Sequence, residues 1–189
     1  TSTCALGEAV TATVGGGSVT MVASGSDAED QLFVNSVAAW DGAMYAAGGS
    51  LYRIDPATGV PTPLSGDGYA NHIAMDASGL YAFDGNNLYR ITVTDDTYTM
   101  GEPIVDLTED FNTDADSYAY CQSMAMQDGK VYLLMQGFDP GYEKQQLWEV
   151  DPADGSARMV LFDALQSICA YQDGKLLALY QSWSDGSYN

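Results

Sequence analysis

One unit recurs along this sequence, and the recurrence is the feature that most restricts the fold. The first copy runs from Ser36 to Gly59 and reads SVAAWDGAMYAAGGSLYRIDPATG. Related copies begin at His72, Ser123 and Ser167. A chain that repeats a short segment in this way folds as a series of similar units, because each unit buries its apolar side chains against its neighbours.

The first copy reads as three short strands joined by tight turns. Asp41-Gly42 favours the two-residue turn of a β-hairpin, and Gly48-Gly49 marks a second turn. Pro56 has no backbone N–H, so the third strand cannot continue past it inside a sheet. The expected strands are 36–40, 43–47 and 50–54.

A fourth, outer strand is expected in two of the copies. Val60 to Leu64 contains two prolines, which a sheet tolerates at its edge. Arg158 to Phe162 occupies the same place in the third copy. The third copy also carries an insertion at Gln136 to Gln146, and the fourth copy stops before any strand resembling LYRID.

The spacing of the copies favours an all-β fold of the propeller type. Their starts are 36, 51 and 44 residues apart, and no segment shows an apolar face with a helical period. Four strands in a period near 40 are typical of propeller blades. The first strands are built of small residues, which suits a crowded central axis. The expected units lie near 31–66, 69–108, 117–163 and 166–189.

The hairpin followed by LYRIDPATG resembles the blades of bacterial propellers of the PQQ-like, NHL and YWTD type. In those families a Leu-Tyr-x-Ile-Asp strand and turn is a common blade feature. The resemblance covers the chain from about Gln31 to its end and implies the architecture only. The sequence has no YWTD tetrapeptide, no WD dipeptide ending a blade and no kelch pattern, so the activities of these families are not carried over.

Three complete units and a half unit are few for a propeller of four to eight blades. The chain is therefore expected either to be a fragment of a larger propeller or to close into about four blades with its N-terminal strands. The candidate closing strands are Val10 to Val14 and Ser18 to Ser24. Residues 1–17 are interpreted as a tail or linker and 18–189 as the propeller domain. We favour full or partial closure within a molecule cut from a larger one.

The charge of the chain excludes some partners. Acidic residues outnumber basic ones by 26 to 6, which gives a formal net charge of -20. Nucleic acids and anionic membrane surfaces require clustered Lys and Arg, and the six basic residues are dispersed. One explanation of the acidity is solubility, because most Asp and Glu lie in expected turns. The other explanation is cation binding or residence outside the cell. We expect a secreted or surface-attached bacterial protein.

Three cysteines are too few for a disulfide framework, and their spacing does not suggest zinc. Cys121 and Cys169 are expected in core strands as small apolar residues. Cys4 is either an ordinary residue or the lipid-modified cysteine of a surface lipoprotein. No apolar run approaches the roughly 20 residues that span a bilayer.

An acidic run between the second and third units is a candidate calcium loop. Oxygen donors stand at the alternating positions Asp110, Asn112, Asp114 and Asp116. Calcium takes six to eight oxygen ligands in such loops. The run departs from the usual calcium loop, because Ala115 stands in place of the central Gly and the twelfth position is Cys. The alternative is a solvated acidic loop.

His72 is the only histidine, and it stands where the other copies have Ser. At the start of an innermost strand it is expected to face the channel or its mouth. It is therefore a candidate ligand contact or weak base, and the alternative is a structural role. One histidine does not support a catalytic triad, and no G-x-S-x-G motif is present.

Aromatic residues in expected loops are candidate binding residues. Loops carried on a rigid scaffold are frequent recognition sites, and aromatic side chains provide much of the contact energy. The candidates are Phe138, Tyr142, Trp183 and Tyr188.

The function expected from these features is a non-enzymatic binding module that recognises a glycan, a peptide or a partner protein. Further domains of the same parent chain are expected as well. The first alternative is a hydrolase or lyase acting at the channel mouth around His72. The second alternative is a structural spacer stabilised by calcium.

The calcium loop can be tested by thermal unfolding. A cation that binds only the folded chain raises its melting temperature. If Asp110, Asn112, Asp114 and Asp116 hold calcium, millimolar calcium raises the melting temperature and a chelator lowers it. A melting temperature that responds to neither additive excludes the site.

Overall fold

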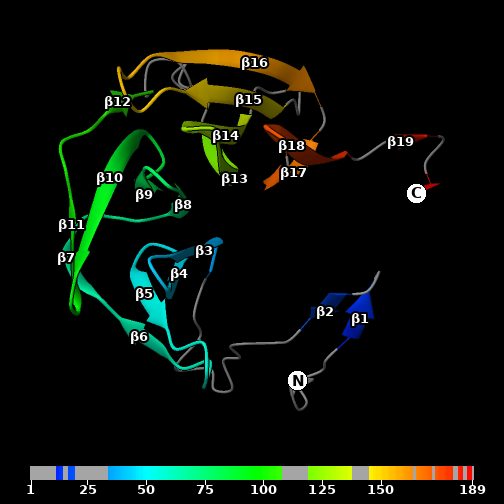
Figure 1. The fold of residues 1–189 in the computed structure, drawn as a ribbon. Helices are drawn as coiled ribbons and strands as arrows, with labels where there is room; N and C mark the ends of the chain where they lie inside the picture. Colours follow the sequence, from blue (N-terminus) through cyan, green and yellow to red (C-terminus); the bar gives the residue numbers. More distant parts are fainter. Residues whose placement is uncertain are drawn as a thin grey trace, which may run out of the picture.

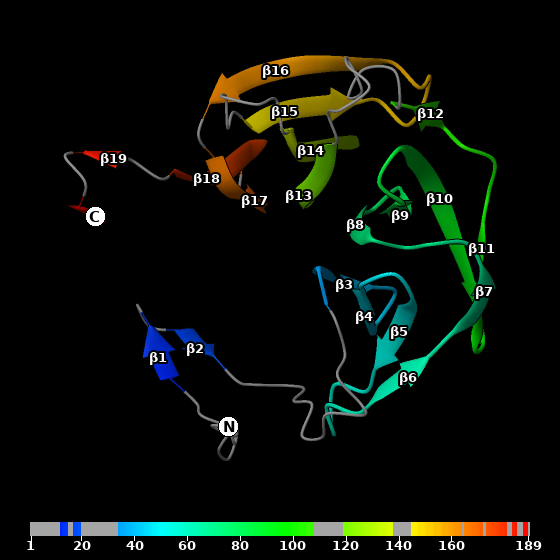
Figure 2. The same cartoon turned by 180° about the vertical axis from the view of Figure 1, so that it is seen from behind.

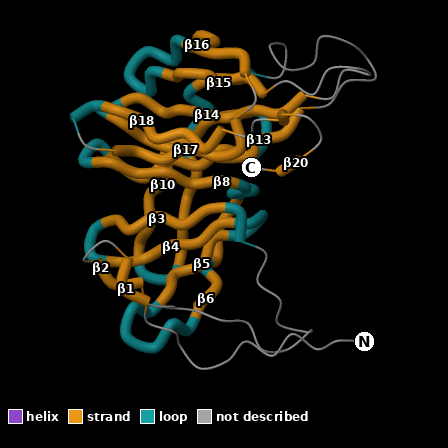
Figure 3. Tube along the Cα trace, turned by 90° about the vertical axis from the view of Figure 1, so that its right-hand side faces the viewer, coloured by secondary structure: helices purple, strands orange, loops and turns teal. Residues whose placement is uncertain are grey.

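The fold is all-β in the computed structural model (Figure 1). The structure describes residues 12–14, 17–19, 34–107, 119–137, 145–163, 165–171, 173–180, 183–184 and 187–188. Four sheets carry the repeated unit, and their pairing is almost entirely antiparallel. No helix occurs among the described residues (Figure 3).

The first sheet follows the expected order of strands. Its strands are β3 (Ser36–Trp40), β4 (Ala43–Ala47), β5 (Leu51–Ile54) and β6 (Pro61–Pro63), paired in that order. The proline-containing strand β6 lies at the outer edge, as expected from the missing N–H groups.

The second sheet has the same inner order with additions at its outer side. Its strands are β8 (His72–Asp76), β9 (Gly79–Phe83), β10 (Asn87–Thr94), β11 (Thr97–Met100), β7 (Ser65–Asp67) and β12 (Val105–Asp106). Strand β7 pairs with β11 in parallel, and β12 pairs with β10.

The third sheet is a four-stranded antiparallel sheet, and the fourth has two described strands. The third contains β13 (Ala119–Gln127), β14 (Lys130–Gly137), β15 (Gln145–Val150) and β16 (Ala157–Asp163). The fourth contains β17 (Leu165–Tyr171) and β18 (Lys175–Tyr180).

The four sheets form an open arc, with their first strands on the inside (Figures 1 and 2). The terminal strands form separate hairpins: β1 (Ala12–Val14) with β2 (Gly17–Val19), and β19 (Trp183–Ser184) with β20 (Ser187–Tyr188). Closure by the N-terminal strands is not observed in the described residues, since β1 and β2 pair with each other and β18 pairs with β17.

Each sheet uses its two faces for different neighbours. We call the face toward the following sheet the leading face and the opposite one the trailing face. In β13, Ala125 belongs to the core shared with the fourth sheet, whereas Met124 and Met126 belong to the core shared with the second. The alternation follows from the two-residue period of a strand.

Apolar side chains fill the three spaces between the sheets. Between the first and second sheets lie Tyr45, Ala47, Leu51, Ile73, Leu80 and Ile91. Between the second and third lie Tyr81, Phe83, Leu88, Met124, Leu133 and Val150. Between the third and fourth lie Ala125, Leu134, Leu147, Leu165 and Ile168. Burial of one Leu or Phe side chain contributes about 1.5–3 kcal/mol, so these contacts hold the arc together.

The predicted Asp-Gly turns are present in three units. Asp41 and Gly42 have φ of 48° and 73°, and the turns at 128–129 and 173–174 have similar values. Two successive positive φ angles identify the type I′ turn, whose twist matches that of the paired strands. In the second unit the turn is different, because the Asp76 carboxylate accepts a hydrogen bond of 2.7 Å from the Ser78 N–H.

The two described cysteines have different environments. Cys121 is buried as expected, and burial raises the pKa of its thiol to about 12. Cys169 is exposed, so its expected place in the core is wrong. It lies on the leading face of β17, which no described sheet covers.

Two glycines with the same backbone angle provide a matched test of the packing between sheets. Gly42 and Gly155 both have φ of +73°, a conformation that disfavours a side chain. A Cβ at Gly155 would lie 2.6 Å from the Ile104 carbonyl oxygen, whereas a Cβ at Gly42 would have no atom within 4 Å. We expect Gly42→Ala to cost about 1–2 kcal/mol in free energy of unfolding and Gly155→Ala clearly more. Equal losses in urea unfolding would contradict the described contact.

Candidate binding cavity

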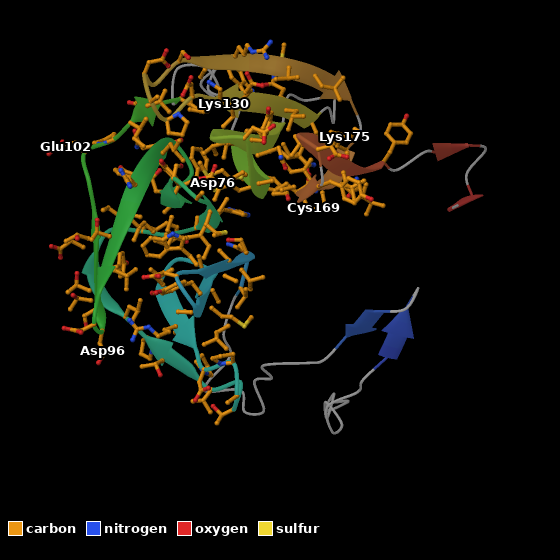
Figure 4. All side chains as sticks on the ribbon, in the orientation of Figure 1. Asp76, Asp96, Glu102, Lys130, Cys169 and Lys175 are labelled. Carbon is orange, nitrogen blue, oxygen red and sulfur yellow. The ribbon has the colours of Figure 1, made fainter. Side chains whose placement is uncertain are left out.

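The first strands of the four sheets line an open cavity of about 500 Å³ on the inner side of the arc. Strands β3, β8, β13 and β17 each contribute three or more residues to its lining. Figure 4 shows Cys169, one of these residues, on β17. A cavity of this size lies in the range of small-ligand sites, about 300–1,000 Å³.

The lining of the cavity is neutral and largely aliphatic. It includes alanines from all four inner strands together with Met75, Met124 and Met126. The polar lining residues are Asn35, Ser36, Ser123 and Ser167, and Cys169 adds a thiol. No charged and no aromatic residue lines the cavity among the described residues. Such a surface suits an uncharged group with an apolar part.

The first residue of the repeat connects neighbouring inner strands. Ser36 Oγ accepts a hydrogen bond of 2.7 Å from the N–H of Ile73. Ser123 Oγ accepts one of 3.2 Å from the N–H of Ile168 and donates one of 3.1 Å to its carbonyl. Ile73 and Ile168 both stand one residue after a repeat start. These bonds fix the spacing of the strands that line the cavity.

The other end of the inner strands is connected as well. Asp76 Oδ2 accepts a hydrogen bond of 3.0 Å from the N–H of Gly129, in the turn of the next sheet. The carboxylate of Asp128 lies beside Gly174 in the same manner, since a Cβ there would be 2.5 Å from Asp128 Oδ2. A hydrogen bond thus joins each pair of neighbouring inner strands beside the cavity, near the repeat start or at the turn.

His72 holds the place of the repeat's first serine and is 3% exposed. It forms a hydrogen bond with the backbone of Gln122, while its Nδ1 has no hydrogen-bond partner. Burial lowers the pKa of His72 to about 4, and the bond to Gln122 offsets part of this effect. The expected position facing the channel differs from this placement, because His72 is not among the lining residues. A ligand contact by His72 stays a prediction.

The other residues predicted as sites are not brought to the cavity by any described contact. Trp183 and Tyr188 are cross-strand partners in the β19–β20 hairpin. The remaining candidates lie outside the described residues: Phe138, Tyr142, Asp110, Asn112, Asp114 and Asp116. In the described part of the chain, no cluster of three or more His, Cys, Asp or Glu side chains could hold a metal.

A charged network in the third sheet lies away from the cavity. Tyr132 donates a hydrogen bond of 2.9 Å to Glu149, which also accepts one of 2.9 Å from Arg158. Burial and the bond to Glu149 raise the pKa of Tyr132 to about 12. Although burial acts in the opposite direction, the bonds from Tyr132 and Arg158 lower the pKa of Glu149. The network joins β14, β15 and β16 and contributes no residue to the cavity lining.

The sequence pattern predicts a channel at the innermost strands, but it does not predict which residues line the inner cavity. Small residues in the first strands are expected to pack at a crowded axis, whereas in the open arc these side chains leave space. The available signal is the serine or histidine at each of the four repeat starts. Only the hydrogen bonds from those positions to the next inner strand show that they set the distance between the strands that line the cavity.

Comparison with known proteins supports the architecture. No protein-family model and no curated protein sequence matches the chain. Among solved structures it is similar to the extracellular domain of the putative one component system BT4673 from B. thetaiotaomicron, with a TM-score of 0.50 and 16% identity. The match covers 77% of this chain and 19% of that one, so this chain spans about a fifth of its length. At this identity the likeness concerns the fold alone. No described helix is long and apolar enough to cross a membrane.

The buried histidine makes stability depend on pH. A histidine side chain has an ordinary pKa of 6.5, and the pKa of His72 in the folded chain is about 4, so the unfolded chain binds more protons between these pH values. The free energy of unfolding therefore falls as the pH falls through this window, by about 2 kcal/mol between pH 7 and pH 5.

His72→Ser restores the residue of the other repeats and removes this contribution. Urea unfolding of both proteins at pH 7 and pH 5 measures it. The wild type should lose about 2 kcal/mol more than the variant. An identical loss in the two proteins would show that His72 is not held neutral by burial.

Proposed function

We propose that this chain forms part of a β-propeller and acts as a ligand-binding module of an extracellular bacterial protein. The observation that carries the proposal is the cavity of about 500 Å³ lined by the inner strands of all four sheets. A wall made by four separate repeats, with a hydrogen bond between each pair of neighbouring inner strands, is a preformed surface, and a preformed site binds at a lower entropic cost.

The fold comparison agrees with this proposal. The similar structure is described as the extracellular domain of a putative one component system. The match covers 77% of this chain and about a fifth of that one, and it concerns the fold of the matched part alone. The open arc and the uncovered face of the fourth sheet are consistent with further sheets. Residence outside the cell also agrees with the net charge of -20.

The chemistry of the lining favours a peptide over a glycan in this cavity. Glycan sites usually present aromatic platforms, and the described lining contains none. Methionine and alanine side chains accommodate aliphatic groups of varied shape. Asn35 and the Ser36 hydroxyl, which accepts a hydrogen bond from Ile73 and can still donate one, provide hydrogen bonds for a backbone amide. Phe138, Tyr142, Trp183 and Tyr188 stay predicted candidates for a second contact region.

The enzymatic alternative is not favoured by any described feature. A general acid or base must lie within hydrogen-bond reach of the substrate. Cys169 is the single titratable side chain among the described lining residues, and it has no basic partner there. His72 is buried outside the lining. The function that the cavity supports best is therefore binding.

Cysteine labelling tests the proposal directly. Cys169 is exposed in the cavity, and Cys121 is buried with a raised pKa, so a thiol reagent should modify Cys169 alone in a Cys4→Ser protein. We expect N-ethylmaleimide at Cys169 to abolish binding of neutral peptides selected from an array. The Cys4→Ser, Cys169→Ser double variant should bind them before and after treatment. Unchanged binding by the labelled protein would exclude the cavity as the site.

A further inference from the structure

Every repeat carries a side-chain carboxamide directly before its first residue. We call the four residues at this position the carboxamide rim: Asn35, Asn71, Gln122 and Gln166. The same functional group therefore stands at the same end of all four inner strands. This end adjoins the cavity, because Asn35 is a lining residue and the two glutamines directly precede the lining residues Ser123 and Ser167.

Two different backbone geometries bring the carboxamides to this end. In the first two sheets Asn35 and Asn71 each donate the backbone N–H to a carbonyl of the second strand, at 2.8 Å and 3.1 Å. In the third and fourth sheets the register shifts at this point, so Gln122 and Gln166 stand at β-bulges. A β-bulge re-aims a side chain and is frequent next to functional sites. The shorter carboxamide thus occurs without the bulge and the longer one with it.

Hydrogen bonds connect the repeat starts from one sheet to the next. Asn35 Nδ2 donates to Asn71 Oδ1 in the second sheet. His72 forms a hydrogen bond with the backbone of Gln122 in the third sheet. The hydroxyl oxygens of Ser123 and Ser167 lie 3.4 Å apart. The rim therefore follows the four inner strands as one continuous polar row.

Two acceptors in this row are buried without a hydrogen-bond partner in the described part of the chain. They are Gln122 Oε1 and His72 Nδ1. The bond to the Gln122 backbone raises the pKa of His72, so the imidazole donates that bond and Nδ1 is left as an acceptor. A buried acceptor without a partner is destabilising, because it has lost its hydrogen bonds to water. What both atoms lack is a hydrogen-bond donor.

The side chain of Gln122 can reach a ligand from this position. The residue as a whole is only half-buried, and it directly precedes Ser123 in the lining. Rotation of its side chain brings the carboxamide to the cavity, where a donor would satisfy Oε1. His72 is 3% exposed and holds the Gln122 backbone, so it is a positioning residue and not a ligand contact.

The cavity beside the rim restricts the kind of donor. Its described lining contains no charged residue, which disfavours an ammonium group, and no aromatic residue, which disfavours a sugar ring. An extended peptide offers main-chain N–H and C=O groups. A carboxamide pairs with both, because it holds an NH2 donor and a carbonyl acceptor. Small aliphatic side chains of such a peptide suit the alanine and methionine residues of the lining.

We propose that the carboxamide rim binds the main chain of an extended, uncharged peptide whose aliphatic side chains enter the cavity. Gln122 and Gln166 accept N–H groups of the peptide, and the amide groups of Asn35 and Asn71 pair with its next residues. Recognition of the main chain makes binding tolerant of different small side chains. This inference rests on the proposed function, and it adds the polar groups that recognise the peptide.

The probe is acetyl-Ala-Ala-Ala-Ala-amide, titrated into the full chain. NMR follows the side-chain NH2 signals of the rim and the methyl signals of the lining methionines. We expect both sets to shift with one dissociation constant, while the NH2 signal of Gln127, at the other end of β13, stays in place. An analogue with lactic acid in place of the two central alanines has ester oxygens instead of two N–H donors. It should bind about tenfold more weakly.

Near-isosteric variants separate recognition from stability. Gln122→Met removes the unpartnered acceptor, so stability in urea should stay the same or rise, and yet binding of the probe should weaken about three- to tenfold. Gln166→Met tests a second rim position and should weaken binding by a similar factor. Gln127→Met is the control. Its carboxamide bonds to Asp128 at 3.1 Å, away from the rim, so binding should not change. A purely structural role of Gln122 would change stability without weakening binding.

Several results would overturn the rim. One is a probe that shifts the lining methionine signals but binds Gln122→Met and Gln166→Met as tightly as the wild type, which leaves the cavity as the site without the rim. Equal binding of the peptide and its ester analogue has the same meaning. Another is tighter binding of maltotriose with the same dependence on Gln122, which assigns the rim to hydroxyl donors. A probe that moves neither set of signals also overturns the rim, and labelling of Cys169 then decides separately whether the cavity binds.

Discussion

The contact between one sheet and the next holds this molecule together. Each sheet offers a leading face that fits the trailing face of its successor, and each inner strand is joined to the following one by a hydrogen bond from the repeat's first residue or by its turn carboxylate. Ser36 with Ile73 and Asp76 with Gly129 are two such bonds. Because the contact repeats, the four sheets curve together into an arc, and the cavity on the inner side is a consequence of that curvature.

The proposed binding function rests on the surfaces that stay exposed where the sheets pack against one another. The inner strands are held at their ends and carry small or flexible side chains between them, so a neutral cavity remains. Beyond β18 the series of contacts ends among the described residues, and an apolar edge and face remain.

Much of the fold could be predicted from the sequence because its signals are local. Asp-Gly turns fix hairpins, prolines fix an outer strand, and the repeat fixes the order of strands. A channel at the innermost strands is expected, but the size and lining of the cavity could not be predicted, since the size of a space between strands depends on distant contacts such as Ser123 with Ile168. The burial of His72 could not be predicted for the same reason, because a single histidine at the start of a strand does not indicate that the next sheet covers it. The exposure of Cys169 likewise depends on which sheet follows.

Methionine methyl resonances show whether the inner-strand cavity binds ligand. Met75, Met124 and Met126 line the cavity, whereas Met159 is 50% exposed on the outer strand β16. During titration with an array-selected neutral peptide, we expect the methyl signals of the three lining methionines to shift together and saturate while that of Met159 stays in place. Shifts confined to Met159, or saturable binding that moves none of the three lining signals, would mean that the ligand binds elsewhere.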